Sequence, residues 1–593
     1  MSPLDFAVVG AYMVITLGLG VYLARRASGS MVDFFVGGRT MPWWLAGTSM
    51  AATTFSIDTP LYVAGVVGTR GIAGNWEWWG YAIAHVILIY VFARLWRRAE
   101  IVTDNELTEI RYGGHPAAIL RAAKGFLFAV VIGPIGIGYA MLAMVKVVDA
   151  LQVFPSLGLD PGASAKLWSV VAVGVFVLLY AGIAGLWGVV ATDFFQFFLG
   201  LAGAVIVAVV AVVHMGGMSE VVAGAQRLTD FDVLSFTPFT FGGGSLIGWS
   251  KAAGISALTF FSYVAILWWA FRRSDGGGEF IQRLSAVRTE ADAEKAAWFF
   301  NIMNYVVRTW PWVVVAVVAL VVYPDLEDPE LGYPRLMLDF LPAGILGLVV
   351  ASLVAAFMST VSTAINWAAS YITNDLYARF ARPDASQREL VWFARVASVL
   401  VTVLGATAAF YADSVATVYR LILAVGTGPG LVLILRWYWW RINAWAELAA
   451  MLAGFVVGAL TSLNNPIYTL RIDDFGLRLL VTAGITLAVW VPVMLFTRPE
   501  NDETLDTFYR HVRPGGPGWE RQRARTGLAP AQDLGLDLQR VCAGLMILFG
   551  LMFGVGGVVL LRPGVAGMNL VTAAVGYRWL RRLRDGAAAA TGG

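Results

Sequence analysis

The sequence predicts an all-α polytopic membrane protein with about 14 transmembrane helices. Of its 593 residues, 58% are hydrophobic and 14% are charged, and the mean hydropathy is +0.70. A soluble domain carries roughly 25% charged residues. Apolar runs of 18 or more residues recur along the chain, and each is long enough to span a bilayer. Lys and Arg gather in alternate loops between these runs, which supports both the number of transmembrane helices and their orientation in the membrane.

The apolar runs define fourteen candidate spans. They cover approximately residues 4–24, 42–69, 78–98, 120–149, 167–187, 189–213, 252–271, 297–322, 341–373, 391–410, 414–436, 444–463, 477–496 and 541–562. With the N-terminus outside, the inner loops hold 27 Lys and Arg and the outer loops hold 7. Because positive residues favour the cytoplasmic side, we expect an integral plasma membrane protein, in a bacterial inner membrane, with its N-terminus outside.

Two segments of the chain leave questions open. The basic tail after Arg562 would lie outside, so either 564–580 returns through the membrane or the tail lies on the surface. Residues 497–540 are polar and contain Pro and Gly, and we expect them to form a cytoplasmic linker. Asp5 alone precedes the first apolar run and no A-x-A cleavage site follows, which indicates a retained helix rather than a signal peptide.

The composition argues against an enzyme. The chain has a single cysteine, Cys542, and four scattered histidines, so it offers neither a disulfide framework nor a zinc pattern. No Walker A, kinase or G-x-S-x-G motif is present. We therefore expect no cofactor and no nucleic-acid partner.

The second span, 42–69, loses its apolar character at its centre. The polar residues there are Thr53, Thr54, Ser56, Asp58 and Thr59, followed by Pro60. Proline removes a backbone donor, and Asp58 or Thr59 could cap a new half-helix. A break at mid-membrane frees carbonyl groups for a cation and points a helix N-terminus at a solute. The alternative is an ordinary proline kink.

Hydroxyl groups cluster in the apolar stretch 349–377. Ala356, Ser359, Thr360 and Thr363 follow the spacing i, i+3, i+4 and i+7 and share one helical face, with Ser362 beside it. Neutral oxygens in a dry setting suit a hard monovalent cation. The alternative is that these hydroxyls bond to carbonyls of the preceding turn and let helices pack closely.

Two ionisable residues, Asp58 and Arg308, lie near mid-depth of their spans. Charges at this depth are costly unless they face a cavity or each other. They form either a structural ion pair or part of a substrate cavity. The tryptophans of the sequence Trp76–Trp79 are expected in an interfacial belt, and Glu77 among them is a candidate for the outer cavity.

Six motifs in the right order carry a resemblance to a known family. They are DFFVGGR (33–39), ELTEIRYG (106–113), GIAGLWGVVATDFFQ (182–196), IQR (281–283), AAFMSTVST…TNDLY (355–377) and RWYWWRINAWAELAAMLAG (436–454). Together they resemble the sodium/solute symporter family, which includes sodium-coupled transporters of sugars, proline, pantothenate, sialic acid and iodide.

The resemblance implies a fold of the LeuT type, with five-plus-five inverted repeats. It divides the chain into an extra N-terminal helix and loop (1–41), a ten-helix transport core (42–443), two further helices (444–496), the linker (497–540) and a last helix with the basic tail (541–593). The counterpart of the broken helix would be span 252–271, interrupted around Ser262–Tyr263.

The resemblance also implies the binding residues. The main sodium site would use carbonyls of Ala52, Phe55 and Ala356 and hydroxyls of Ser359 and Thr360. A second sodium site would use Asp193, Ser359, Ser362 and Thr363. The substrate cavity would include Thr54, Asp58, Thr59, Glu77, Tyr263 and Arg308. Sodium is the only metal expected, as the coupling ion.

The substrate is left open by departures from the family pattern. Proline-type members have an Asp where this chain has Thr54, and sugar-type members have a Gln near Thr59. The expected function is a sodium-coupled symporter, working as a monomer, that imports a small polar solute (a sugar, amino acid or carboxylate) by alternating access. The alternative is a solute sensor of the same fold that does not transport, and a channel is a third possibility.

Overall fold

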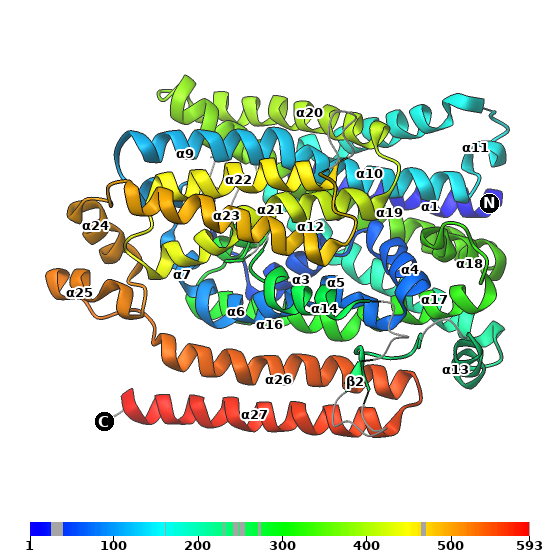
Figure 1. Ribbon diagram of the computed structural model, residues 1–593. Helices are drawn as coiled ribbons and strands as arrows, with labels where there is room; N and C mark the ends of the chain where they lie inside the picture. Colours follow the sequence, from blue (N-terminus) through cyan, green and yellow to red (C-terminus); the bar gives the residue numbers. More distant parts are fainter. Residues whose placement is uncertain are drawn as a thin grey trace.

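The computed structural model is almost entirely helical among the residues it describes, which are 1–24, 39–160, 162–228, 232–240, 248–249, 255–270, 274–463 and 470–591. Most helices lie roughly parallel to one another across the molecule, with their connections gathered at its two ends (Figure 1). Ten helices among the described residues are long and apolar enough to cross a membrane. The molecule is therefore an integral membrane protein of the expected all-α class.

The N-terminal half contains these elements: α1 (Pro3–Ala24), α3 (Trp43–Thr53), α4 (Asp58–Arg70), η2 (Ile72–Asn75), α5 (Trp76–Trp79), α6 (Tyr81–Ile87), η3 (Leu88–Phe92), α7 (Ala93–Ala99), α8 (Leu107–Arg111), α9 (Gly114–Phe126), η4 (Leu127–Ile132), α10 (Gly133–Ala150), α11 (Val153–Ser156), η5 (Gly162–Ser164), α12 (Ala165–His214), α13 (Met218–Arg227), α14 (Ala257–Ser262) and η7 (Tyr263–Leu267). Two short strands, β1 (Phe239–Thr240) and β2 (Gly248–Trp249), pair antiparallel between α13 and α14.

The C-terminal half contains α15 (Gly278–Ala286), α16 (Glu290–Asn301), η8 (Ile302–Val307), α17 (Thr309–Val322), η9 (Pro329–Leu331), α18 (Gly332–Phe340), α19 (Ile345–Ser370), η10 (Tyr371–Ala381), α20 (Gln387–Tyr411), α21 (Val415–Tyr438), α22 (Ala444–Ser462), α23 (Phe475–Phe496), α24 (Asp502–Val512), η11 (Pro517–Trp519), α25 (Glu520–Thr526), α26 (Leu534–Val559) and α27 (Pro563–Thr591). We call the end of the molecule that carries α24 and α25 the basic end, because the Arg-rich loops that we expect inside the cell meet there (Figure 1).

The second span is broken in two, as its sequence predicts. Helix α3 ends at Thr53 and α4 begins at Asp58. Pro60 lies in the first turn of α4, where a backbone N–H group would have no partner within the helix, so proline costs no hydrogen bond there. The break leaves the backbone of the last turn of α3 without a continuing helix, directly inside the buried core.

The count of fourteen spans stays a prediction. Besides the ten long helices, three shorter apolar helices are found, Pro3–Leu19, Ala165–Leu178 and Ala257–Leu267, and the broken helix adds two short halves. The predicted spans 167–187 and 189–213 form one helical element, α12. Its two ends lie at the same end of the molecule, opposite the basic end (Figure 1), so its arms run antiparallel.

The predicted linker 497–540 is not an unstructured connection. Helices α24 and α25 fold back onto the basic end of the core, and Phe508, Tyr509 and Trp519 are completely buried there. The indole of Trp519 donates to the carbonyl of Trp437 at 2.7 Å. The signal in the sequence is the apolar series Leu505, Phe508, Tyr509 and Val512, which has helical spacing.

The direction of the C-terminal tail is given by α27. This helix turns back after Arg562 and runs antiparallel to α26 for its full length, so that its Arg-rich end lies at the basic end (Figure 1). Helix α27 is not among the ten described helices that are long and apolar enough to cross a membrane, so a return through the membrane stays a prediction. With such a return, the tail would not violate the positive-inside pattern.

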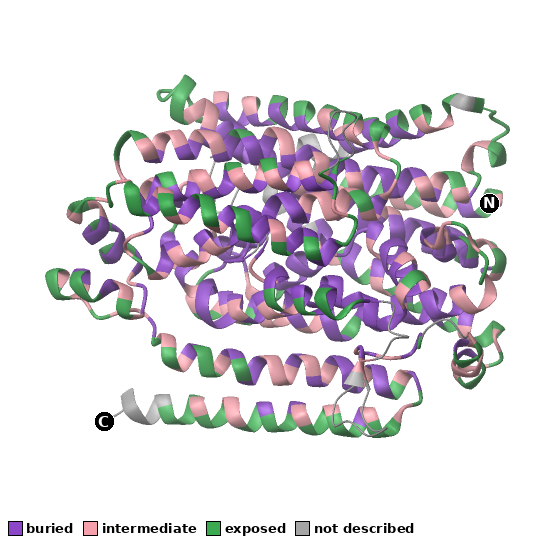
Figure 2. Ribbon diagram, in the orientation of Figure 1, coloured by how far each residue is buried: buried purple, intermediate pink, exposed green. Residues whose placement is uncertain are grey.

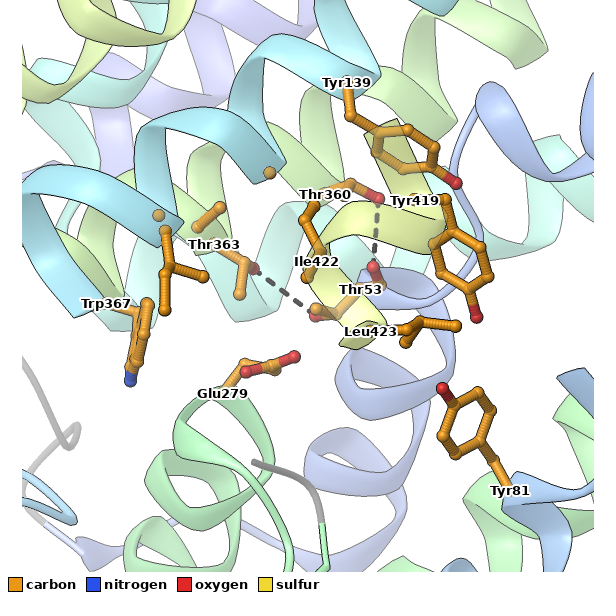
Figure 3. A pocket seen from close by; sticks show the side chains of 14 residues that line it. Thr53, Tyr81, Tyr139, Glu279, Thr360, Thr363, Trp367, Tyr419, Ile422 and Leu423 are labelled. Carbon is orange, nitrogen blue, oxygen red and sulfur yellow. Dashed lines mark hydrogen bonds between the residues drawn. The ribbon is translucent and has the colours of Figure 1, made fainter. Parts of the chain in front are cut away.

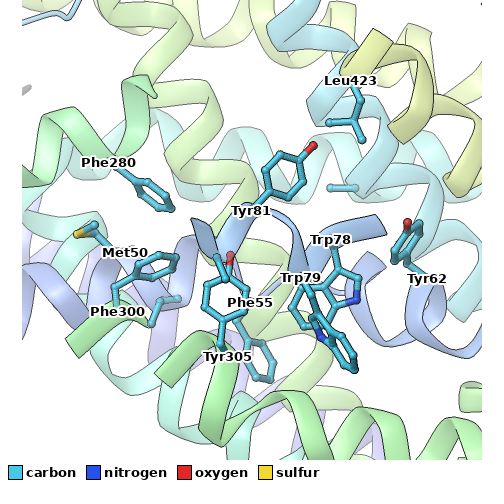
Figure 4. Close-up of a cluster of buried hydrophobic side chains, with 14 of the residues drawn as sticks. Met50, Phe55, Tyr62, Trp78, Trp79, Tyr81, Phe280, Phe300, Tyr305 and Leu423 are labelled. Carbon is cyan, nitrogen blue, oxygen red and sulfur yellow. The ribbon is translucent and has the colours of Figure 1, made fainter. Parts of the chain in front are cut away.

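The core lies where the broken helix meets its neighbours. Figure 2 shows buried residues concentrated in the middle of the bundle and exposed residues along its outer helices. Around the break, apolar and aromatic side chains form a dense cluster that includes Met50, Phe55, Trp79, Phe280 and Phe300 (Figure 4). Dense packing on these sides fixes the position of the break relative to the helices that face it.

Candidate functional site

Two adjoining cavities of about 150 and 160 Å³ lie beside the break between α3 and α4. Five residues line both of them: Thr53, Tyr81, Tyr139, Thr360 and Tyr419. The first cavity extends along α19 to Thr363 and Trp367, and Glu279 of α15 also lines it (Figure 3). The second extends along α4 and the η8 segment. Together they form a polar chamber in the centre of the bundle.

Asp58 lines the second cavity from the first turn of α4, and it is 3% exposed. The hydroxyl of Tyr139 donates to its Oδ2 atom. Its Oδ1 atom is buried and has no hydrogen-bond partner among the described residues. The Ser56 hydroxyl and the Arg308 guanidinium lie near this carboxylate and partly compensate its charge, but Oδ1 makes no direct hydrogen bond to a described residue. It therefore offers an acceptor to a bound ion or solute.

Arg308 lines the same cavity from the end of η8. Its guanidinium donates to the carbonyl of Ala51 at 2.9 Å and to the side chain of Asn304, and it lies over the rings of Phe55 and Trp312. Arg308 thus holds the last turn of α3, whereas Asp58 is held by Tyr139. The two charges share one cavity and attract each other, and each also has polar neighbours of its own, so an isolated ion pair does not describe them.

Thr54 and Thr59 also line the second cavity, whereas Glu77 and Tyr263 belong to a neighbouring ionic cluster. Glu77 is completely buried, and its carboxylate accepts from Arg70 and Arg420, each at 2.8 Å, and from Tyr263 at 3.1 Å. These residues join the end of α4, α5, η7 and α21 on the side of the cavity away from the basic end.

Aromatic residues that the sequence placed elsewhere form much of the cavity wall. Trp78 is buried and stacks on Tyr305 with ring centroids 6.0 Å apart, and Tyr139 stacks on Tyr419 at 5.9 Å. Trp76 and Trp79 are buried as well, so these tryptophans do not form an interfacial belt. Membrane-interface tryptophans and buried ones have the same local sequence signal, and only the packing distinguishes them.

The hydroxyl face of α19 meets the broken end of α3, as the sequence predicts. The Thr360 hydroxyl donates to the Thr53 carbonyl at 3.0 Å, and the Thr53 and Thr363 hydroxyls lie 3.4 Å apart (Figure 3). Ala52, Phe55, Ala356 and Ser359, the other predicted ligands of the main ion, are each at most 2% exposed. Thr360 and Thr363 of α19 therefore contact the last turn of α3, and the predicted ligands beside them are buried.

Asp193 on α12 also reaches this face. It accepts from the Ser359 hydroxyl at 2.6 Å and from the Ser49 hydroxyl at 2.5 Å. The guanidinium of Arg283 lies 3.6 Å from Asp193 and donates to the Thr363 hydroxyl at 2.7 Å. The sequence singled out the IQR motif but gave its arginine no role. Its role here is to compensate the charge of a buried carboxylate.

Ser362 behaves as in the alternative interpretation of the hydroxyl cluster. Its hydroxyl donates to the Ser359 carbonyl one turn earlier at 3.2 Å. Three of the residues predicted for a second sodium ion are therefore connected. Ser359 bonds directly to Asp193, and Arg283 links Asp193 to Thr363. Ser362 instead bonds within its own helix.

Of the six motifs, two are only partly covered by the described residues. Residues 33–38 of DFFVGGR lie outside them, and in 182–196 the side chains of 182–189 and 191 are not described. The hydroxyl motif of α19 and the arginine of IQR lie at the central site, and other motifs lie at the basic end of the core. Arg111 of ELTEIRYG, for example, donates to the carbonyls of Arg436 and Ile442.

A broken helix, a facing row of hydroxyls and a polar central chamber define a secondary transporter. The family model described as "Sodium:solute symporter family" matches residues 34–454, and the chain belongs to this family.

Similar proteins are described as transporters of several different solutes. The "Sodium/glucose cotransporter" of Vibrio parahaemolyticus is 26% identical over 479 residues, which cover 76% of this chain and 84% of that protein. The "High-affinity proline transporter PutP" of Bacillus subtilis (strain 168) is 24% identical over 500 residues, covering 81% and 98%. The "Sodium/myo-inositol cotransporter" of Mus musculus is 24% identical, covering 77% and 67%.

A solved structure shares the fold. It is described as the substrate-bound outward-open state of a Na+-coupled sialic acid symporter, and it superposes with a TM-score of 0.66 at 19% identity. The match covers 84% of this chain and 99% of that one. The LeuT-type fold that the sequence resemblance implies is therefore confirmed.

Proposed function

We propose that this protein imports a small polar solute by coupling it to the inward flow of sodium. The observation that carries the proposal is the meeting of the broken α3–α4 helix with the hydroxyl face of α19, beside a polar cavity. Hard cations prefer oxygen ligands, and the candidate site offers carbonyls and hydroxyls in a region that excludes water. Each sodium ion that crosses ~100 mV yields about 2.3 kcal/mol for the work of accumulation.

The main ion site in this proposal consists of the carbonyls of Ala52, Phe55 and Ala356 and the hydroxyls of Ser359 and Thr360. The Thr360–Thr53 hydrogen bond supports it, since it holds α19 against the last turn of α3 at 3.0 Å. Sodium would replace weak contacts between the two helices with ion–oxygen contacts. Binding would then favour one relative position of the bundle, which is how an ion drives alternating access.

A second sodium ion at Asp193, Ser359, Ser362 and Thr363 is also proposed, with a constraint. Arg283 already compensates the Asp193 carboxylate. A second cation would have to share that carboxylate with the guanidinium or displace it. The number of ions per solute molecule therefore depends on the position of Arg283 during the cycle.

The solute would occupy the second cavity, between Asp58, Thr54, Thr59 and Arg308. Hydroxyls, one carboxylate oxygen without a partner and stacked aromatic rings suit a hydroxylated or zwitterionic organic molecule. We propose a plasma membrane location, in a bacterial inner membrane with the N-terminus outside, and a monomer as the working unit, because one chain lines the whole cavity.

The decisive experiment is uptake into proteoliposomes. Purified protein is reconstituted, and radiolabelled sugars, amino acids and carboxylates are offered with and without an inward sodium gradient. A symporter accumulates one class of solute only when the gradient is present. Binding that depends on sodium without accumulation would instead identify a sensor of the same fold, and solute flux that ignores the gradient would contradict coupling.

A further inference from the structure

A third, larger cavity lies between α16 and the α26–α27 hairpin, and none of its lining residues lines the two central cavities. It has a volume of about 690 Å³ and opens at the surface of the bundle. Figure 1 shows the hairpin at the edge of the molecule, with α27 next to α26 and separated from the rest of the bundle by it. The groove is lined by α16, by the starts of α3, α7, η8 and α26, by η3 and by the C-terminal part of α27. Because α26 begins and α27 ends at the basic end, the groove lies towards that end (Figure 1).

Four basic side chains line the groove: Arg94, Lys295, Arg540 and Arg584. Two of them are compensated by acids. Arg94 pairs with Glu294, and Arg540 pairs with the buried Asp537 at 3.0 Å.

The other two basic side chains lie at the mouth of the groove. Lys295 is exposed and only 3.8 Å from Asp292, and Arg584 is exposed and makes no ion pair with any described residue. The groove therefore has a net positive mouth.

The deeper wall of the groove is apolar. It is formed by half-buried side chains that include Trp43, Trp298, Phe299, Met303 and Leu580. The indole of Trp298 donates to the Tyr90 hydroxyl at 2.9 Å and the two rings pack edge to face, so their polar atoms are satisfied and they present mainly carbon to the groove. A hydrocarbon wall below a cationic mouth matches the two parts of a phospholipid.

We propose that this groove binds an acidic phospholipid from the cytoplasmic leaflet. Its phosphate group would lie between Lys295 and Arg584, and an acyl chain would lie along Trp298, Met303 and Leu580. Basic pockets between helices at the cytoplasmic surface attract anionic headgroups, and each Lys or Arg near the surface strengthens the attraction. The bound lipid would join α27 to α16 across the groove that both helices line.

The test measures lipid retention by native mass spectrometry of the full-length protein in detergent. Phosphatidylglycerol, phosphatidylcholine and inorganic phosphate are titrated separately at high ionic strength, which screens attraction beyond the groove. We expect phosphatidylglycerol to be retained at least tenfold more tightly than phosphatidylcholine, and inorganic phosphate not to displace it. Lys295→Gln combined with Arg584→Gln should reduce that preference at least threefold.

The matched control is Arg581→Gln combined with Arg582→Gln. It removes two exposed arginines from the same helix, but neither lines the groove. The control should retain phosphatidylglycerol like the unmodified protein, and both double variants should keep its melting temperature. The proposal would be overturned if both lipids were retained equally or if phosphate displaced phosphatidylglycerol. It would also be overturned if the groove variant lost less than threefold of its lipid preference, or if the control variant lost as much of that preference as the groove variant. The inference is independent of the proposed transport function.

Discussion

At the scale of single residues, the hydroxyls of Ser359 and Thr360 are the sharpest test of the main ion site. Ser359→Ala and Thr360→Ala each remove one candidate ligand and leave a void of only one hydroxyl. We expect sodium-driven uptake to fall more than tenfold in each variant. The folded state should lose only about 0.5–1.5 kcal/mol, as is usual for one buried hydrogen bond.

The measurement is initial uptake against sodium concentration, together with the melting temperature of each variant. Ser398→Ala is the matched control, because this buried hydroxyl on α20 only donates to the Ala394 carbonyl at 2.9 Å. It should transport normally. If the Ser359 and Thr360 double variant still accumulated solute with unchanged sodium dependence, the ion-site interpretation would be wrong.

Asp193 determines whether a second ion is coupled. We expect two sodium ions per solute in the unmodified protein and one in Asp193→Asn, because the amide cannot supply the charge that a second cation needs. The reversal potential of uptake in liposomes gives this ratio. Asp160→Asn, in an exposed loop, serves as the control. A ratio of one that Asp193→Asn leaves unchanged would show that Arg283 is the permanent partner of this carboxylate.

Asp58 and Arg308 are expected to select the solute. Arg308→Gln should weaken recognition of a carboxylate, and Asp58→Asn should weaken recognition of an amine or a sugar hydroxyl, each by tenfold or more. The reason is that charged groups at this depth cost at least ~2.5–3.5 kcal/mol unless a partner compensates them. Equilibrium binding of the transported solute measures the effect.

A double-mutant cycle separates this role from a structural one. If the two charges mainly stabilise each other, the double variant should recover stability that both single variants lose. Solute binding that is unchanged in both single variants would remove the two residues from the substrate site.

At the scale of elements, the α24–α25 segment is expected to stabilise the basic end of the core. Trp519 is completely buried and lies 5.1 Å from the guanidinium of Arg111, which itself bonds to the end of α21. Trp519→Ala leaves a cavity and removes this contact, and such substitutions cost about 3–5 kcal/mol. The melting temperature in detergent should fall by several degrees. Trp392→Ala, at a position 64% exposed on α20, should change it little.

At the scale of the whole molecule, the direction of α27 determines on which side of the membrane the C-terminus lies. If α27 returns through the membrane, the two termini lie on opposite sides. In a Cys542→Ser background, a cysteine at Ser2 should react with a membrane-impermeant thiol reagent in intact cells. A cysteine at Gly586 should react only after the membrane is opened. Equal labelling of both positions in intact cells would place α27 on the outer surface instead.

The sequence by itself determined the class, the broken helix and the hydroxyl face that includes Ser359, Thr360 and Thr363, whereas the individual sodium ligands were implied only by the family resemblance. These features follow from local signals: apolar runs of membrane length, a proline after a polar cluster, and hydroxyls at helical spacing. The family resemblance extended them to the LeuT-type fold. Local signals suffice here because the membrane excludes unpaired backbone groups and so permits few arrangements.

Only the tertiary structure decided which polar groups meet. It placed Arg283 beside Asp193, moved Glu77 and Tyr263 out of the cavity into an ionic cluster, and turned Trp78 inward to line it. It also folded the polar segment 497–540 onto the core and returned α27 along α26. The physical reason is that each of these outcomes depends on contacts between segments far apart in the chain, and a residue's own neighbours in sequence carry no record of them.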